Sequence, residues 1–361
     1  MRKSSLAAAV GIVTVGAVLV AGAPAAASPS KMQAAIDTLV RDGGVVGAQV
    51  KLTANGREQN LRAGVAKIDG DRPVPESGNF RIGSVTKQFT ATVLLQLAGE
   101  GKIALDEPVK TYLPGLLPKE DKITSRMILQ HTAGIPNYTN MIETGGEGYL
   151  ENQKRRFTDQ EIVDIALAKP LDFEPGTKFS YSNTGYVVAG MLIKAVTGNT
   201  WQSEVTKRIA KPLGLRDTSA PQYSTGIPGP NAHGYVKTKD GFADVTRLSP
   251  SIAGAGGAMI SSTADLTTYM SALLGGRLLK PAQFAEMKKT ITVSPEYGLG
   301  LRVLPTTCGK TIIGHTGGIP GWLTASFTTP DGKVKLAASV NEKEETDIEL
   351  FHKMVDVAFC G

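Results

Sequence analysis

A serine and a lysine stand three residues apart in the segment Ser84-Val85-Thr86-Lys87, where an apolar pattern typical of a helix begins. Helical spacing places the hydroxyl and the amine on one face. A serine hydroxyl is a poor nucleophile at neutral pH and needs a base beside it, which a buried amine can supply. The same two residues also fit a serine helix cap followed by a surface lysine. The pair alone therefore leaves covalent chemistry and plain structure as alternatives.

Two further short motifs follow in the chain and favour chemistry. Tyr181-Ser182-Asn183 begins 97 residues after Ser84, and His315-Thr316-Gly317 begins 134 residues after Tyr181. A tyrosine can pass a proton to a leaving nitrogen, and an asparagine can hydrogen bond a substrate amide. The chain contains no G-x-S-x-G sequence, which excludes the usual nucleophile elbow of a Ser-His-Asp hydrolase.

In this order the three motifs resemble the Ser-x-x-Lys, Tyr-x-Asn and basic-Thr-Gly signatures of the serine β-lactamase and penicillin-binding superfamily. The resemblance extends to LQHTAGIPNY, SNTGYVVAGMLIKAVTG and GGAMISSTADL, and it covers essentially the whole chain after the first 27 residues. The sequence looks most similar to the class C-like branch, and within it to soluble secreted D-Ala-D-Ala carboxypeptidases. This resemblance implies that Ser84, Lys87 and Tyr181 are the catalytic residues.

Two routes for the serine proton stay open at this point. Lys87 acts as a neutral base if burial lowers its pKa, because desolvation disfavours the charged amine. Alternatively, a cationic Lys87 lowers the pKa of Tyr181, and the resulting phenolate takes the proton from Ser84.

The resemblance also implies a set of residues on the substrate side. The backbone N–H groups of Ser84 and Gly318 would form the oxyanion hole, which stabilises charge that develops in the transition state. The remaining substrate-binding residues by resemblance are Asn183, Arg302, His315, Thr316 and Gly317.

Two positions on this side set the expected specificity. His315 stands where most relatives have lysine, and a histidine with an ordinary pKa of about 6.5 is largely neutral at pH 7. Arg302, if it is not a surface arginine, then matches the carboxypeptidase arginine that binds the terminal carboxylate, with Thr316 as its hydroxyl partner. Gly318 stands where those carboxypeptidases carry a second hydroxyl residue, which puts strict carboxypeptidase specificity in doubt.

The expected function is a penicillin-sensitive D-Ala-D-Ala carboxypeptidase that acts on peptidoglycan stem peptides through an acyl-Ser84 intermediate. Alternatives by resemblance are a D-specific aminopeptidase or endopeptidase, an esterase and a class C-like β-lactamase, with β-lactams as covalent inhibitors in the peptidase cases. A β-lactam or muropeptide sensor that is not an enzyme is a further alternative. We expect a monomer without a cofactor.

A second histidine motif, His131-Thr132-Ala133-Gly134, also reads as basic-Thr-Gly. It precedes Tyr181 and ends a helical segment, so it is interpreted as a loop at the edge of the cleft. The four histidines, which are His131, His233, His315 and His352, lie far apart without zinc-like spacing, so no metal site is expected.

The N-terminus and the cysteines predict a secreted protein. Residues 1–27 combine a basic start, an apolar stretch and Ala25-Ala26-Ala27, which is typical of a cleaved signal peptide rather than a membrane anchor. Export favours a disulfide between Cys308 and Cys360 over two free thiols. The formal net charge of +6 comes from scattered basic residues without a nucleic-acid-binding motif, so no nucleic-acid partner is expected.

Strand patterns at both chain ends and helical patterns between them predict an α/β (α+β) fold. Residues 47–53, 59–66, 311–315, 323–329 and 333–340 read as strands, and residues 32–40 and 344–359 as helices. We expect a five-stranded antiparallel sheet flanked by the terminal helices, with an inserted mostly helical domain, as in β-lactamases and transpeptidases. The predicted sheet domain comprises residues 28–83 and 214–361, the helical domain comprises 84–213, and the active site lies in the cleft between them.

Overall fold

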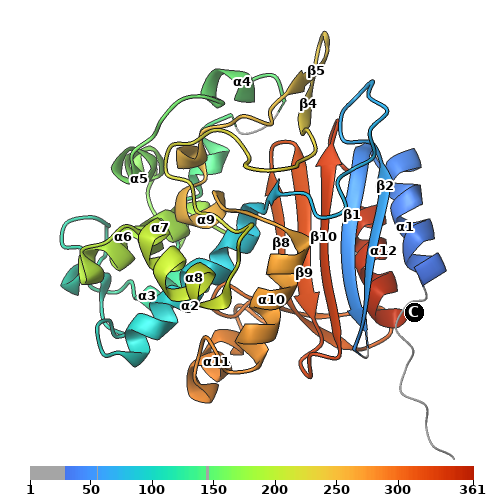
Figure 1. Ribbon diagram of the computed structural model, residues 1–361. Helices are drawn as coiled ribbons and strands as arrows, with labels where there is room; N and C mark the ends of the chain where they lie inside the picture. Colours follow the sequence, from blue (N-terminus) through green and yellow to red (C-terminus); the bar gives the residue numbers. More distant parts are fainter. Residues whose placement is uncertain (1–28, 55, 144–145) are drawn as a thin grey trace, which may run out of the picture.

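The computed structural model describes residues 29–54, 56–143 and 146–361, and an antiparallel sheet forms its centre (Figure 1). The predicted signal peptide lies outside the described residues. In spatial order the six strands are β2 (Arg57–Gly64), β1 (Val45–Ala54), β10 (Val334–Glu342), β9 (Trp322–Thr328), β8 (Thr311–Ile319) and β7 (Arg302–Pro305). The five predicted strands are all present, and each differs from its expected bounds by a few residues.

The sixth strand, β7, corrects the predicted count of five. Arg302 pairs with Gly314 and Pro305 with Thr311, so β7 is a short strand at the edge of the sheet. Four residues that end in proline give a weak strand pattern, and proline is tolerated because an edge strand has one row of unpaired backbone groups. Past Gly314, no strand of the described residues pairs with β8 on this side, so its edge is open toward the helices.

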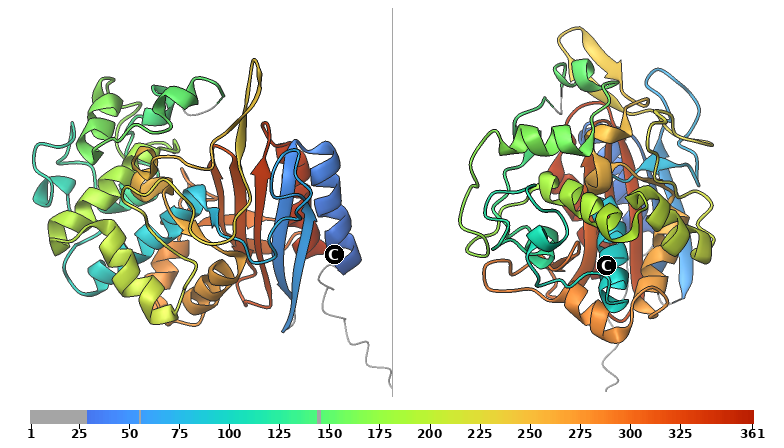
Figure 2. Two further views of the ribbon diagram at one scale, coloured as in Figure 1. Left: turned by 45° about the horizontal axis from the view of Figure 1, so that its top comes forward. Right: turned by 90° about the vertical axis from the view of Figure 1, so that its left-hand side faces the viewer.

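The two terminal helices, α1 (Pro29–Asp42) and α12 (Ile348–Cys360), cover one face of the sheet (Figure 2). Met32, Ile36, Phe351 and Met354 are buried there against the strands. A disulfide joins Cys308, which follows β7, to Cys360 at the end of α12, as the two-cysteine count predicted.

The other face carries the larger hydrophobic core, which also fills the space between the helices. Helix α10 (Thr263–Leu274) packs on β10, β9 and β1. The remaining helices are α2 (Thr86–Gly99), α3 (Ser125–Leu129), α4 (Tyr149–Asn152), α5 (Asp159–Leu167), α6 (Asn183–Thr197), α7 (Trp201–Val205), α8 (Lys211–Leu213), α9 (Gly254–Gly257) and α11 (Pro281–Lys288). The division into a sheet domain and a helical domain at residues 84 and 213 stays a prediction.

Two small sheets complete the fold. The pair β3 (Phe80–Arg81) and β6 (Ile260–Ser261) leads directly into the Ser84 segment, whereas β4 (Tyr235–Thr238) and β5 (Gly241–Asp244) form a hairpin. Among the described residues, no helix has both the length and the apolar character needed to cross a membrane.

Candidate active site

Ser84 lies in a single turn of 3-10 helix, η1 (Gly83–Val85), between β3 and α2. The turn packs against the open end of β8 so closely that two glycines are required. A Cβ on Gly317 would lie 1.9 Å from the Ile82 carbonyl oxygen, and Gly83 has a φ of +48°, which favours glycine. A Cβ on Gly83 would lie 2.8 Å from the backbone nitrogen of Gly318. The turn therefore holds Ser84 against Gly317 and Gly318, as the predicted oxyanion hole requires.

Lys87 is completely buried in the first turn of α2 and makes three hydrogen-bonding contacts. Its Nζ lies 2.9 Å from Ser84 Oγ, 2.7 Å from Asn183 Oδ1 and 2.7 Å from the Gly256 carbonyl oxygen. Burial lowers the pKa of Lys87 well below its ordinary value, and the charge of Arg302 lowers this pKa further.

The lowered pKa favours a neutral amine, and the three contacts of Lys87 are compatible with it. Asn183 Oδ1 and the Gly256 carbonyl can only accept, so they take two N–H donors. In the neutral amine, the third direction holds the lone pair, which points to the Ser84 hydroxyl and can accept its proton.

Tyr181 lies over the same amine, with its ring centroid 4.9 Å from Lys87 Nζ. Burial raises the pKa of the Tyr181 phenol well above its ordinary value, and a hydrogen bond with Ser84 offsets only part of this rise. The direction of this shift favours a protonated phenol that donates. It disfavours the phenolate base that was one of the two proton routes considered from the sequence.

The His131 motif forms a turn and loop after α3, as the sequence predicted. The His131 side chain itself is buried, and its ring centroid lies 4.2 Å from that of Tyr181. The motif was set aside because it matched basic-Thr-Gly out of order, so its contact with the Tyr181 segment was missed.

His315 lies inside the protein wall rather than in the substrate space. Its Nε2 lies 2.8 Å from the Tyr297 hydroxyl, and its Nδ1 contacts the Thr316 carbonyl. Burial, and to a smaller extent the charge of Arg302, lowers the pKa of His315, so the ring is neutral. Both ring nitrogens are engaged by the protein, which leaves neither for a substrate.

Thr316 and Arg302 lie apart from the cavity into which Ser84 opens. Successive side chains of a strand point to opposite faces, so Thr316 faces away from His315 and lines a separate cavity of about 520 Å³ with Phe327 and His352. Arg302 is half-buried, and its guanidinium carbon lies 5.7 Å from the ring centroid of Tyr297. The buried Nε of Arg302 has no hydrogen-bond partner in the described part of the chain.

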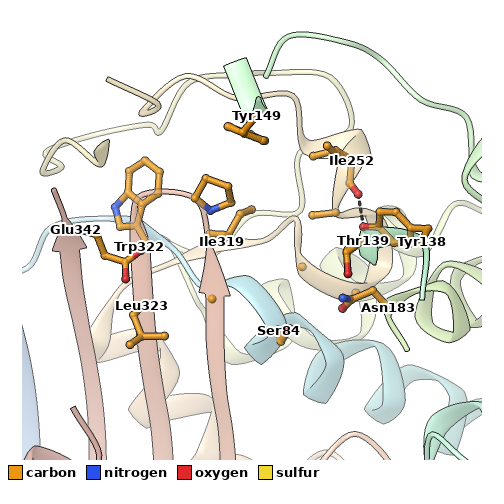
Figure 3. Close-up of a pocket in the computed structure, with 15 residues that line it drawn as sticks. Ser84, Tyr138, Thr139, Tyr149, Asn183, Ile252, Ile319, Trp322, Leu323 and Glu342 are labelled. Atoms are coloured by element: carbon orange, nitrogen blue, oxygen red, sulfur yellow. Dashed lines mark hydrogen bonds between the residues drawn. The ribbon is translucent and has the colours of Figure 1, made fainter. Parts of the chain in front are cut away.

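The cavity beside Ser84 has a volume of about 310 Å³ and lies between the helices and the ends of β8, β9 and β10 (Figure 3). Ser84, Asn183 and Gly318 are among the residues that line it. The rest of the lining is mostly apolar, with one carboxylate, and includes Tyr138, Tyr149, Ile252, Ile319, Trp322, Leu323 and Glu342. The described ranges contain no group of histidine, cysteine, aspartate and glutamate side chains that could hold a metal ion.

Comparison with known proteins places this arrangement in a family, since the family model described as Beta-lactamase matches residues 32–359. The chain belongs to the Beta-lactamase family. A curated relative is Penicillin-binding protein 4* of Bacillus subtilis (strain 168), which is 24% identical over 303 residues. That match covers 79% of this chain and 66% of the relative's own length.

Two solved structures match this chain nearly end to end. One is a D-stereospecific amidohydrolase from Streptomyces sp., with 38% identity, a TM-score of 0.85 and coverage of 92% of this chain and 99% of that chain. The other is the D-amino acid amidase from Ochrobactrum anthropi SV3 complexed with L-phenylalanine amide, with 30% identity, a TM-score of 0.80 and coverage of 91% and 96%.

Proposed function

We propose that this family member is a D-stereospecific amide hydrolase, which cleaves the amide bond at the carboxyl group of a D-amino acid through an acyl-Ser84 intermediate. The observation that carries the proposal is the Ser84–Lys87 pair, with Tyr181 above it, in a chain that aligns over almost its full length with two D-specific amidohydrolases. Among the alternatives from the sequence, the D-specific aminopeptidase and endopeptidase are nearest to this activity, and a D-specific amide hydrolase now takes precedence over the carboxypeptidase.

The geometry of the site supports the following steps of acylation. Ser84 Oγ attacks the carbonyl carbon and its proton passes to the neutral Lys87 amine at 2.9 Å. The N–H groups of Ser84 and Gly318 stabilise the oxyanion. When the C–N bond breaks, the Tyr181 hydroxyl donates a proton to the leaving nitrogen and regains one from Lys87.

Deacylation reverses these roles. Water attacks the acyl carbon, and its proton passes to Lys87, either directly or through Tyr181. The ester C–O bond then breaks and Ser84 recovers a proton, which returns the site to its starting state.

The carboxypeptidase remains the second candidate, and Arg302 is the observation in its favour. Arg302 lies near enough to lower the pKa of Lys87, and a substrate carboxylate needs a fixed cation. Against it, neither Arg302 nor Thr316 lines the cavity beside Ser84, and Gly318 has no hydroxyl. A substrate whose leaving group is ammonia has no terminal carboxylate, so its binding needs no fixed cation at that position.

The proposal includes export and sensitivity to β-lactams. The N-terminal pattern and the Cys308–Cys360 disulfide support an oxidising compartment. The similarity to a penicillin-binding protein supports acylation of Ser84 by a β-lactam. A peptidoglycan substrate and a monomeric state belong to the same proposal.

A substrate panel tests the function. We expect kcat/KM for D-phenylalanine amide to exceed that for L-phenylalanine amide by about 100-fold or more, since a wrong enantiomer misplaces the carbonyl carbon. We also expect it to exceed that for D-Ala release from an acyl-D-Ala-D-Ala peptide. Faster release of D-Ala than of ammonia would favour the carboxypeptidase, and equal rates with both enantiomers would contradict D-specificity.

A further inference from the structure

Glu342 contributes a carboxylate to the cavity into which Ser84 opens, and the mechanism does not use it. It is the last residue of β10 and lies beside Trp322 and Leu323 in the cavity wall (Figure 3). Among the described residues that line this cavity, Glu342 alone carries a formal charge.

This carboxylate is held in place without a counter-charge. The Thr346 hydroxyl donates to its Oε1 at 2.6 Å, and in the described part of the chain no lysine or arginine nitrogen lies within 4.0 Å of it. Burial raises the pKa of Glu342, and the neighbouring Glu345 raises it further. The nearby cation of Lys237 is paired with Glu344 at 2.9 Å. A cationic ligand would therefore relieve the cost of a desolvated, unpaired carboxylate.

The separation between Glu342 and Ser84 determines how long such a ligand must be. Ser84 lies against Gly318 on β8, and Glu342 ends β10; the axes of these two strands, with β9 between them, lie about 10 Å apart. The α-ammonium of an amino acid lies only about 2.5 Å from its carbonyl carbon and cannot bridge that distance. An extended lysine side chain carries its ammonium about 7.5 Å from the carbonyl carbon, and a charge-assisted hydrogen bond adds about 2.8 Å.

The wall between the two groups suits the methylenes of such a side chain. Ile319, Trp322 and Leu323 are apolar, and Gly318 presents no side chain that would cover Leu323. We propose that Glu342 selects acyl donors with a cationic side chain of lysine length, such as a D-lysyl amide. This inference rests on the proposed amide hydrolysis.

The experiment compares D-lysine amide with D-norleucine amide, which has the same chain length without the amine. The wild type is expected to favour D-lysine amide in kcat/KM by about tenfold or more, and Glu342→Gln is expected to reduce this ratio about tenfold. Glu58→Gln is the control, because the Glu58 carboxylate is exposed on β2 and does not line this cavity; it should keep the ratio. An unchanged ratio in Glu342→Gln would overturn the inference.

Binding measurements keep this test separate from the proposed function. Calorimetry with Ser84→Ala, and with the same variant carrying Glu342→Gln, gives the ratio of the two dissociation constants without turnover. If the wild type hydrolyses neither amide, the proposed function fails, and the binding ratio still decides the role of Glu342.

A second, independent observation concerns His131, which holds the Tyr181 segment from three directions. The His131 carbonyl accepts from the N–H of Ser180 at 3.0 Å, and its Nδ1 accepts from the N–H of Ser182 at 3.1 Å. The imidazole also lies against the Tyr181 ring at 4.2 Å between centroids. One residue thus fixes both neighbours of Tyr181 and the ring itself.

The chemistry of the ring and backbone fits this role. Because Nδ1 accepts, the proton lies on Nε2, and burial lowers the pKa of His131, so the ring stays neutral. Nε2 has no polar partner among the described residues, and the Tyr297 ring lies 4.7 Å away at a steep angle, as an N–H···π contact requires. His131 also has a φ of +60°, an uncommon backbone conformation for a residue other than glycine.

We infer that His131 is a positioning residue for Tyr181 and acts on catalysis only through it. His131→Phe keeps a ring but leaves the Ser182 N–H without an acceptor, so kcat for a chromogenic D-amino acid anilide, whose leaving nitrogen needs the Tyr181 proton, should fall about 10- to 100-fold while KM changes little. In a Tyr181→Phe background, the same substitution should lower kcat no further. If the double variant instead loses kcat by the product of the two single effects, the inference is overturned.

A more conservative substitution is expected to restore part of the lost activity. His131→Asn supplies an acceptor and tolerates a positive φ, so it should retain more activity than His131→Phe. It also replaces His131→Phe in the cycle if the phenylalanine variant does not fold. Thermal melting of each variant separates a change in stability from the change in kcat.

Discussion

Replacement of Ser84 by alanine is expected to lower kcat/KM for a D-amino acid amide by about 10⁴-fold or more, because the proposed acyl-enzyme forms on the Ser84 hydroxyl. Ser84 Oγ lies 2.9 Å from Lys87 Nζ, and η1 holds it against Gly318. Steady-state kinetics on the purified variant checks this expectation. Ser271→Ala is the matched control, since the Ser271 hydroxyl bonds within α10 and should leave activity within about twofold.

The stability of the variant makes the result interpretable. Ser84 is half-buried and its side chain contacts Lys87, so Ser84→Ala removes one hydrogen bond and little apolar packing. Its melting temperature should stay near that of the wild type. A variant that folds normally and keeps more than about one hundredth of the activity would remove Ser84 from the mechanism.

Replacement of Lys87 by methionine is expected to lower kcat/KM by about 10³-fold, within the usual contribution of a general base. In the proposed mechanism the neutral amine accepts the serine proton, and burial lowers the Lys87 pKa. Activity of the wild type should therefore be lost as pH falls through that lowered pKa and should level off above it. A pH profile of kcat/KM from acidic to mildly alkaline buffer measures this dependence.

Lys87→Arg separates the two roles considered for the lysine. Arginine stays charged at every accessible pH, so it can tune Tyr181 but cannot act as a neutral base. We expect Lys87→Arg to be as inactive as Lys87→Met. Clear activity in the arginine variant, with loss in the methionine variant, would instead support a cationic Lys87.

The motif residues and the sheet were predictable because their signals are local. The spacing of Ser84 and Lys87, and the alternation in β8, β9 and β10, are visible within a few neighbouring residues. Alternation along β8 puts His315 and Thr316 on opposite faces of the strand, which argues against both side chains lining one substrate space.

The rest of the site depends on contacts between distant segments. His131 meets the Tyr181 segment about 50 residues later in the chain, and no local pattern predicts that contact. Glu342 reaches the cavity only because β10 lies two strands from β8. The polarity of the cavity wall therefore became visible only in the folded chain.

Trapping of the acyl-enzyme tests the central claim most directly. A D-amino acid ester has a better leaving group than the amide, so the acyl-enzyme should accumulate before an acid quench. Mass spectrometry of the digested protein is predicted to find the D-acyl group on the peptide that contains Ser84, with far less from the L-ester. No adduct, an adduct on another residue, or equal adducts from both enantiomers would contradict the account.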